Sequence, residues 1–390
     1  MSGYTGTTSE QNALLSEDAF RNLLGALQAP KIQASKIENE PRGRGHYAMV
    51  YHGTALVQSR RVQVALKVFH KSNTRVGLER LTRNIIRETR VWSQLRHPNI
   101  LPLLGVCPEI ESRRIWLVSP WIENGNLSEY LNNNPRADCV GLCRGIVRGV
   151  HYLHSVDVLH EDIRATNVLV DANEVPLLAD FGLSRFVEEL PAAGDATTGL
   201  YQGSLRWMAP ERIQPTTFGM AAGAAQSAAS DVYSVGMTMY EIFTRKMPFH
   251  QKRDIELVQT IVRGVRPDHP GNVAIMRGMN PRLWEFMWDT WDHDRAKRPQ
   301  LEVALQTVLF DPETPKSTTS QLKGVTRNAY SRKTWVEIDL APSEPVYELE
   351  NWSGGQWTDS HGVAHSHGGT GLYLGRTRSG EKGLFPGRSS

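Results

Sequence analysis

The chain has 390 residues, of which 40% are hydrophobic and 22% are charged, the proportions of an ordinary globular protein. This length accommodates one large two-lobed domain with tails, or two ordinary domains. A formal net charge of +3 is too small to indicate a nucleic acid or a membrane surface as partner, so no nucleic-acid binding is expected.

The number of cysteines and the N-terminal sequence indicate the cellular compartment of the protein. Three cysteines are too few for a disulfide framework and are typical of a reducing environment. Cys139 and Cys143 share a helical face without a histidine in a ligand pattern, which favours a core role over a metal site. The chain has neither a signal-peptide pattern nor a long apolar run, so no membrane insertion is expected. These features predict a cytosolic protein, with the nucleus as the alternative.

Residues 1–35 are expected to form an N-terminal extension. Its apolar residues Phe20, Leu23, Leu24 and Leu27 lie on one helical face, and Ser16 is a plausible N-cap. We expect a short amphipathic helix that docks on the body of the same chain.

A glycine-rich segment, 43–51, precedes an alternating strand at 62–69. Glycines allow backbone amides to approach phosphate oxygens without an intervening Cβ. Gly43 and Gly45 alone are more typical of a turn, but the strand that follows, which carries Lys67, strengthens the phosphate-binding interpretation.

Two further segments have clear periodicity. The run 84–95 has helical apolar spacing with Glu88 near its middle. The apolar run 115–119 predicts a buried strand that leads into a linker at 120–127.

Residues 159–183 contain several polar side chains that could take part in catalysis or metal binding. Asp162 and Asn167 lie on a polar loop, and the apolar runs 168–170 and 175–178 flank a polar turn and predict a hairpin that ends at Asp180. Carboxylate and amide oxygens suit Mg²⁺, which also retains water and substrate phosphate ligands. Asn167 and Asp180 would hold the metal, and Asp162 would accept a proton from an attacking hydroxyl. The alternative is that these residues are only turn formers.

These motifs support a family resemblance. HEDIRATN followed by DFG resembles the catalytic loop and metal-binding triplet of eukaryotic protein kinases, and VALK at 64–67 is similar to the kinase VAIK strand. MAPE at 208–211 resembles the kinase APE anchor, and Gly203-Ser204 before Trp207-Met208 resembles the tyrosine-kinase-like group of serine/threonine kinases. The resemblance implies an α+β, two-lobed protein-kinase fold over 36–310. It has a small, mostly antiparallel β N-lobe with one main helix and a larger, mainly helical C-lobe.

The resemblance also implies site residues, with ATP and Mg²⁺ as cofactors and a protein substrate as partner. Asp162, Arg164, Lys67 and Glu88 would be catalytic. Glu88 is favoured over Glu79 as the carboxylate partner of Lys67, because it precedes residues 95–100, which resemble the family's turn after this helix. Asp231 would brace the catalytic loop, and Arg298 would pair with Glu211. The residues expected around ATP are Gly43, Arg44, Gly45, Ala48, Val50, Ala65, Lys67, Ser119, Pro120, Ile122, Asn167, Leu169 and Asp180, of which Asn167 and Asp180 also hold metal.

Three departures from the family pattern have consequences. Ala48 replaces the third glycine, and Pro41-Arg42 predicts a loosened first strand. Glu161 replaces the arginine that commonly receives an activation-loop phosphate. Because a carboxylate would repel that phosphate, we expect activity to be independent of activation-loop phosphorylation.

Residues 311–390 are rich in Pro, Ser, Thr, Gly and His and are expected to form a low-complexity tail. Its histidines around 361–367 are more typical of a solvated loop than of a metal site. The segment 375–386 looks like the end of an SH3 domain, and we expect a degenerate remnant or a mostly disordered extension.

The sequence thus predicts an active protein kinase that transfers the ATP γ-phosphate to protein serine or threonine in signal transduction. A tyrosine-directed kinase is supported by RATN at 164–167 and opposed by Gly203-Ser204. A nucleotide-binding pseudokinase scaffold is the other alternative. The oligomeric state is left open.

Overall fold

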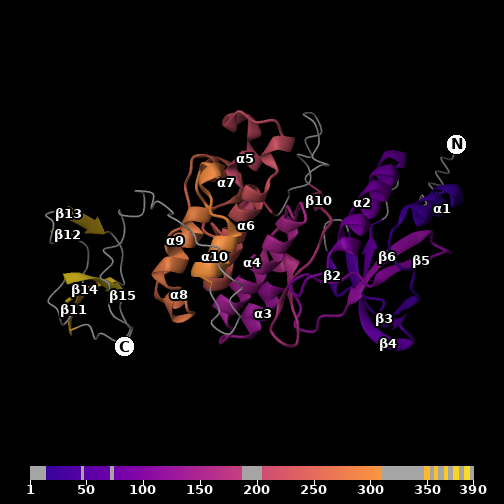
Figure 1. Cartoon of the computed structure of the whole chain (residues 1–390), viewed down its shortest axis with the longest axis horizontal. Helices are drawn as coiled ribbons and strands as arrows, with labels where there is room; N and C mark the ends of the chain where they lie inside the picture. The colour runs from indigo at the N-terminus through magenta and orange to yellow at the C-terminus, as the bar shows by residue number, and fades with distance from the viewer. Residues whose placement is uncertain are drawn as a thin grey trace, which may run out of the picture.

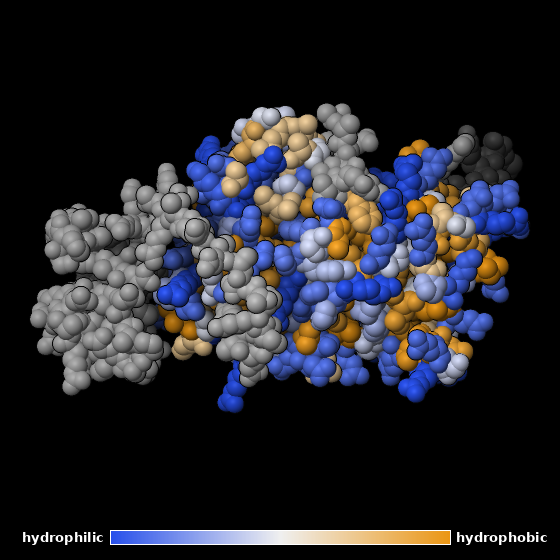
Figure 2. Space-filling model, in the orientation of Figure 1, coloured by the Kyte–Doolittle hydropathy of each residue, from blue (hydrophilic) through white to orange (hydrophobic). Residues whose placement is uncertain are grey.

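A computed structural model describes residues 15–44, 48–70, 74–186 and 204–309, together with five strands between 347 and 386. The first four ranges form a small lobe built on a sheet and a larger helical lobe (Figure 1). This arrangement confirms the predicted two-lobed α+β fold. On the face in Figure 2, hydrophilic and hydrophobic residues are interspersed over both lobes.

The small lobe is an antiparallel sheet in the order β1-β3-β4-β6-β5, with β2 also paired to β3. Alternate residues of β4, Val64, Leu66 and Val68, are buried on one face, as expected for a sheet that packs on that side. The strands are β1 (Ala34–Lys36), β2 (Gly43–Arg44), β3 (Ala48–Val57), β4 (Arg60–Phe69), β5 (Gly105–Glu109) and β6 (Arg114–Pro120).

The first strand is interrupted, as Pro41 and Arg42 predicted. Residues 37–42 separate β1 from β2, and both pieces pair with β3. Proline has no amide proton to contribute to the ladder, whereas the Arg42 amide still donates to Val50 O at 2.8 Å.

Two helices accompany this sheet, α1 (Glu17–Ala26) and the long α2 (Arg75–Gln94). The Ser16 hydroxyl accepts from the Ala19 amide at 3.1 Å, so the predicted N-cap is present. Phe20 and Leu23 are buried in the core, which is the docking expected from the helical pattern. The segment after α1 also joins the sheet, because the Ile32 amide donates to Val106 O at 2.9 Å.

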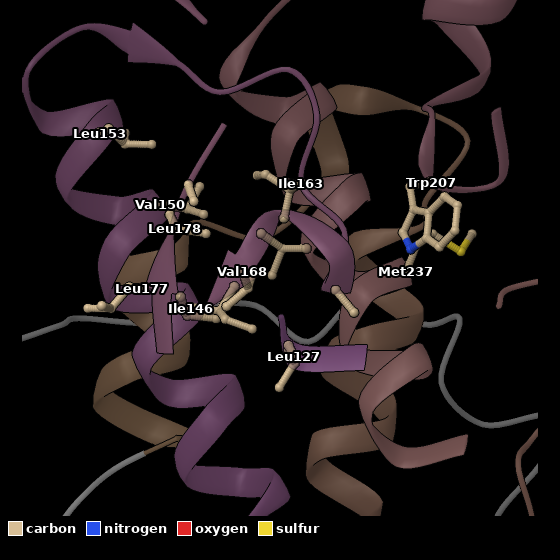
Figure 3. Packing of buried hydrophobic residues seen from close by; sticks show 14 of the residues in the cluster. Leu127, Ile146, Val150, Leu153, Ile163, Val168, Leu177, Leu178, Trp207 and Met237 are labelled. Carbon is tan, nitrogen blue, oxygen red and sulfur yellow. The ribbon is translucent and has the colours of Figure 1, made fainter. Parts of the chain in front are cut away.

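The large lobe is organised around α6 (Ala228–Thr244), which is buried along most of its length. The core continues from the small lobe into the large one, and Figure 3 shows part of it. Cys139 and Cys143 are buried there, in line with the predicted core role. The other helices are α3 (Leu127–Asn133), α4 (Cys139–Ser155), α5 (Pro210–Ile213), α7 (Asp254–Val262), α8 (Asn272–Met276), α9 (Pro281–Thr290) and α10 (Leu301–Thr307).

Short elements between the lobes carry the polar loop. The predicted hairpin is present, with Val168 opposite Leu178 and Val170 opposite Pro176. Asp171 Oδ1 closes its turn by accepting from the amides of Asn173 and Val175. The short elements that follow α4 in the chain are β7 (Val158–Leu159), η1 (Ala165–Asn167), β8 (Val168–Val170), β9 (Pro176–Leu178), β10 (Arg185–Phe186), η3 (Leu205–Trp207), η4 (Pro215–Phe218), η5 (Gly223–Ala225) and η6 (Arg295–Lys297).

The tail carries more regular structure than the sequence suggested. Strands β11, β14 and β15 form one antiparallel sheet, and β12 pairs with β13. Histidines 365 and 367 therefore lie in a strand, whereas we expected a loop. The bounds are β11 (Tyr347–Asn351), β12 (Gly355–Thr358), β13 (Ala364–His367), β14 (Leu372–Arg376) and β15 (Lys382–Pro386).

Candidate active site

The hairpin brings the three polar residues of the central motif together. Asn167 Nδ2 donates to Asp162 at both the backbone oxygen, 2.9 Å, and Oδ2, 2.7 Å. The Ala179 amide donates to Asn167 O at 2.9 Å, which sets Asp180 beside Asn167. Asp162, Asn167 and Asp180 thus gather at one end of β8 and β9.

Helix α6 holds the loop that carries Asp162. Asp231 accepts hydrogen bonds from the amides of His160, at 2.9 Å, and Glu161, at 3.0 Å, which is the predicted brace. Burial disfavours the charge of Asp231, but its hydrogen bonds with His154 and His160 hold the pKa of the carboxyl below its usual range. About two turns further on, Thr238 Oγ1 donates to Ile163 O at 3.2 Å.

Lys67 on β4 lies between two carboxylates. Its Nζ is 2.6 Å from Glu88 Oε1 on α2 and 2.6 Å from Asp180 Oδ1. Burial opposes the ammonium charge, but Asp180 and Glu88 outweigh it and raise the pKa of Lys67. Burial also raises the pKa of Glu88, whereas Lys67 more than offsets burial at Asp180 and lowers its pKa. Glu88 is therefore the carboxylate on α2 that reaches Lys67.

The DFG segment is packed under α2. Phe181 is fully buried, with its ring 5.7 Å from that of Trp92 and 5.3 Å from that of His160. Arg87 donates to Gly182 O at 2.7 Å. These contacts keep Asp180 beside Lys67 and Asn167.

Five of the residues expected around ATP share one face of the small-lobe sheet. Ala48 lies opposite Phe69, Val50 opposite Lys67, and Ala65 opposite Ser119. Directly opposed residues, and residues two apart on one strand, point to the same face. Ala48, Val50, Ala65, Lys67 and Ser119 therefore lie on a common face.

The remaining expected residues are distributed around this face. Gly43 pairs with Val50, Arg44 is described only in its backbone, and Gly45 lies outside the described residues. Leu169 forms an antiparallel bridge with Asn126, near the end of the linker. In the linker, Pro120 pairs with Val64, and Ile122 O accepts from the Gly125 amide at 3.2 Å.

The oxygen ligands present suit a divalent metal. Asn167 Nδ2 donates to Asp162, so the side-chain oxygen of Asn167 is the atom left to bind a metal. The side chain of Asp180 is about half exposed and therefore accessible to a metal. Among the described residues, no group of three or more His, Cys, Asp and Glu could hold a metal by itself. Mg²⁺ accepts few protein ligands when phosphates and water complete its shell, so the donor set fits that ion.

Glu161 has partners that the sequence did not suggest. Its buried carboxylate lies 2.6 Å from Arg185 Nε on β10 and 3.2 Å from Arg212 on α5. Arg212 also donates to Glu161 O at 2.9 Å. Burial raises the pKa of Glu161, partly offset by the two arginines. Glu161 therefore joins β10, which follows the DFG segment, and α5, which contains the Glu211 anchor, to the catalytic loop.

The expected anchor of the activation segment is present. Arg298 makes two hydrogen bonds to Glu211, at 2.6 and 2.8 Å, and both side chains are buried. This bidentate geometry is the strong form of an arginine–carboxylate pair.

A second buried carboxylate, Glu241 on α6, was also missed. Its Oε2 accepts from the Ala165 amide at 3.1 Å and from Trp207 Nε1 at 3.0 Å. Arg164 lies nearby, with its guanidinium 5.7 Å over the Trp207 ring and its Nε 4.0 Å from Asp162 Oδ1. The available signal was a lone acidic residue within an apolar helical run.

Ephrin receptors are among the known proteins similar to this chain. The type-A receptor 8 of Homo sapiens is 33% identical over 309 residues, which cover 77% of this chain and 28% of that receptor. The type-A receptor 5 of Gallus gallus is 30% identical over 345 residues, covering 85% of this chain and 31% of the receptor. The chain thus spans less than a third of the length of these relatives.

These relatives contradict the expected cytosolic or nuclear location, because they are named as receptors. The expectation depended on the lack of a leader or a long apolar run. Because this chain aligns with only part of each receptor, the segments it contains do not determine the location of the protein.

No helix in the described part of the chain has the length and apolar character needed to cross a bilayer.

The family assignment comes from the family model described as protein tyrosine and serine/threonine kinase, which matches residues 38–308. The matched residues include β4 with Lys67, the catalytic loop, the DFG segment and the Glu211–Arg298 pair described above. The chain therefore belongs to the eukaryotic protein kinases, in the tyrosine-kinase-like group.

Proposed function

We propose that this chain is an active kinase that transfers the γ-phosphate of ATP to serine or threonine hydroxyls of proteins in signalling. The observation that carries the proposal is the Lys67–Glu88–Asp180 ion group beside the Asp162–Asn167 pair. Phosphoryl transfer depends on positioning and electrostatic stabilisation, and this arrangement supplies groups for both.

Each residue has a distinct role in this proposal. Asp162 orients the acceptor hydroxyl and accepts its proton. Lys67, held by Glu88, contacts the α and β phosphates, and Arg164 offsets charge near the transferred group. Asn167 and Asp180 would hold Mg²⁺, which when bound neutralises the phosphate oxygens.

The nucleotide would lie against the common sheet face. Ala48, Val50 and Ala65 offer small apolar surfaces, and Ser119 is a small residue at the back of that face. Pro120 and Ile122 would present linker backbone groups to the adenine edge. Proline lacks an amide proton, but its carbonyl is the group required there.

Ser204 supports serine or threonine as the acceptor. It precedes η3, ahead of Trp207, and the resemblance to the tyrosine-kinase-like serine/threonine kinases associates a hydroxyl at this position with a shallow acceptor site. The opposing candidate is a tyrosine-directed kinase, and the similarity to ephrin receptors favours it. The RATN sequence at 164–167 supports it as well.

Phosphoamino-acid analysis of a peptide mixture phosphorylated by the chain separates the two specificities. Phosphoserine and phosphothreonine as the main products would support the first. Phosphotyrosine as the main product would overturn it in favour of the second. Nucleotide binding without any transfer would instead indicate a pseudokinase scaffold, which the retention of Lys67, Glu88 and Asp162 argues against.

A further inference from the structure

Glu241 connects two segments that are distant in sequence. Its carboxylate is buried, with the residue 5% exposed, and one oxygen, Oε2, accepts from both the Ala165 amide and Trp207 Nε1. Ala165 follows directly after Arg164 in the catalytic loop, and Trp207 belongs to η3 in the activation segment. A single side chain of α6 thus fixes the distance between these segments.

The contacts continue from Trp207 to the proposed base. The Arg164 guanidinium lies 5.7 Å over the Trp207 ring, and Arg164 Nε lies 4.0 Å from Asp162 Oδ1. Figure 3 shows the indole of Trp207 beside Met237 of α6, in the core that supports the loop. A displacement of Trp207 would therefore move the surface on which Arg164 rests, next to Asp162.

The buried position of the Glu241 carboxylate disfavours its ionised form. Burial raises its pKa to about 7, although the Ala165 amide, the Trp207 N–H and the Arg164 guanidinium all face it and lower the pKa in part. A buried carboxylate of this kind disfavours folding when it is ionised. Its bridging contacts give it a role that an apolar residue could not supply.

We propose that Glu241 is a positioning residue for the acceptor substrate, because it holds Trp207 and Arg164 in register with Asp162. This inference depends on the proposed kinase function and goes beyond it by assigning a residue that touches neither nucleotide nor reacting atoms. Ionised Glu241 accepts both hydrogen bonds at full strength, since charge-assisted bonds are stronger than neutral ones. Protonation weakens the bridge.

The first test compares acceptor and nucleotide kinetics in Glu241→Gln and Trp207→Phe, which remove the charge and the N–H donor respectively. We expect the KM for an acceptor peptide to rise roughly tenfold in each variant, with the KM for ATP within about twofold of wild type. Tyr240→Phe is the matched control, since Tyr240 is the adjacent buried residue on α6 and lacks these bridging contacts. It should leave both values unchanged.

The second test uses pH. In the wild type, the kcat/KM for the acceptor should rise between about pH 6 and about pH 8 through a step near 7, and this step should disappear in Glu241→Gln. The indole N–H signal of Trp207 in a ¹H–¹⁵N spectrum, assigned with Trp207→Phe, should shift with the same midpoint. This signal does not depend on catalysis.

An unchanged acceptor KM in a Glu241→Gln protein that melts at the wild-type temperature would overturn the inference. So would a Trp207 signal that does not titrate. A wild type that transfers no phosphate would overturn the kinase function, and this role for Glu241 with it. In that case a titrating Trp207 signal would still establish the bridge, which distinguishes the two failures.

Discussion

Arg212 donates to the backbone oxygen of Glu161 at 2.9 Å and lies 3.2 Å from its carboxylate, deep in the large lobe. Arg185 approaches the same carboxylate at 2.6 Å. A buried acidic residue next to Asp162, the proposed base, therefore contacts two arginines, Arg185 on β10 and Arg212 on α5. These ion pairs within the chain would take the place of the contact that an activation-loop phosphate commonly makes with an arginine at the position of Glu161.

Activity is therefore expected to persist after phosphatase treatment. The Glu161 carboxylate already forms ion pairs with both Arg185 and Arg212, so we expect that no phosphate is required to hold these two arginines in place. Initial rates of peptide phosphorylation before and after phosphatase treatment measure this directly. Loss of most of the activity, restored by rephosphorylation, would contradict the expectation.

Glu161→Gln should destabilise the protein by roughly 3 kcal/mol, because removing one charge of a buried ion group leaves the others uncompensated. Urea denaturation provides the free energy of unfolding. Glu17→Gln is the control, since the Glu17–Arg21 pair is exposed and its loss should cost less than about 0.5 kcal/mol. Equal effects of the two substitutions would show that the Glu161 group contributes no special stability.

Asp162→Asn should abolish phosphate transfer and leave nucleotide affinity nearly intact. The amide cannot accept the proton of the acceptor hydroxyl, while the groups proposed to contact nucleotide remain in place. Steady-state rates and calorimetric titration with ATP and Mg²⁺ measure the two properties separately. Asp157→Asn, on the exposed turn before β7, is the matched control. Turnover of Asp162→Asn at the wild-type rate would exclude Asp162 as the base.

The stability contribution of Glu241 should depend on pH. The folded state holds this proton up to about pH 7, whereas the unfolded chain releases it near the ordinary value of 4.5. The folded state binds more protons between these values, so stability should fall as pH rises from about 5 to about 7. The loss should not exceed roughly 3 kcal/mol. In Glu241→Gln, the free energy of unfolding should lack this dependence on pH. Parallel curves of the free energy of unfolding against pH for the variant and the wild type would refute the assignment.

Local patterns predicted individual elements of the fold, whereas the two-lobed architecture followed from the resemblance to protein kinases. The alternation of β4, the hairpin around Asp171 and the Ser16 cap each follow from a few neighbouring residues. Short-range patterns were sufficient for these features. The carboxylate on α2 that meets Lys67 was instead identified from the resemblance of residues 95–100 to the turn that follows this helix in protein kinases.

The contacts that sequence could not supply join residues far apart along the chain. Glu161 was interpreted only as a repulsive charge, since its partners come from β10 and α5. Glu241 falls within an apolar helix and gave no sign that it would reach Ala165 and Trp207. The strands from Tyr347 onward were missed because glycine and histidine obscure the alternation on which strand prediction depends.

The most direct test of the account is Mg²⁺-dependent transfer of labelled γ-phosphate from ATP to a generic protein substrate, with Lys67→Met for comparison. Methionine keeps the apolar stem of Lys67 and removes the ammonium that lies between Glu88 and Asp180. The account predicts transfer by the wild type and its loss in the variant. Nucleotide binding by the wild type without transfer would contradict an active kinase and leave a scaffold with a kinase fold.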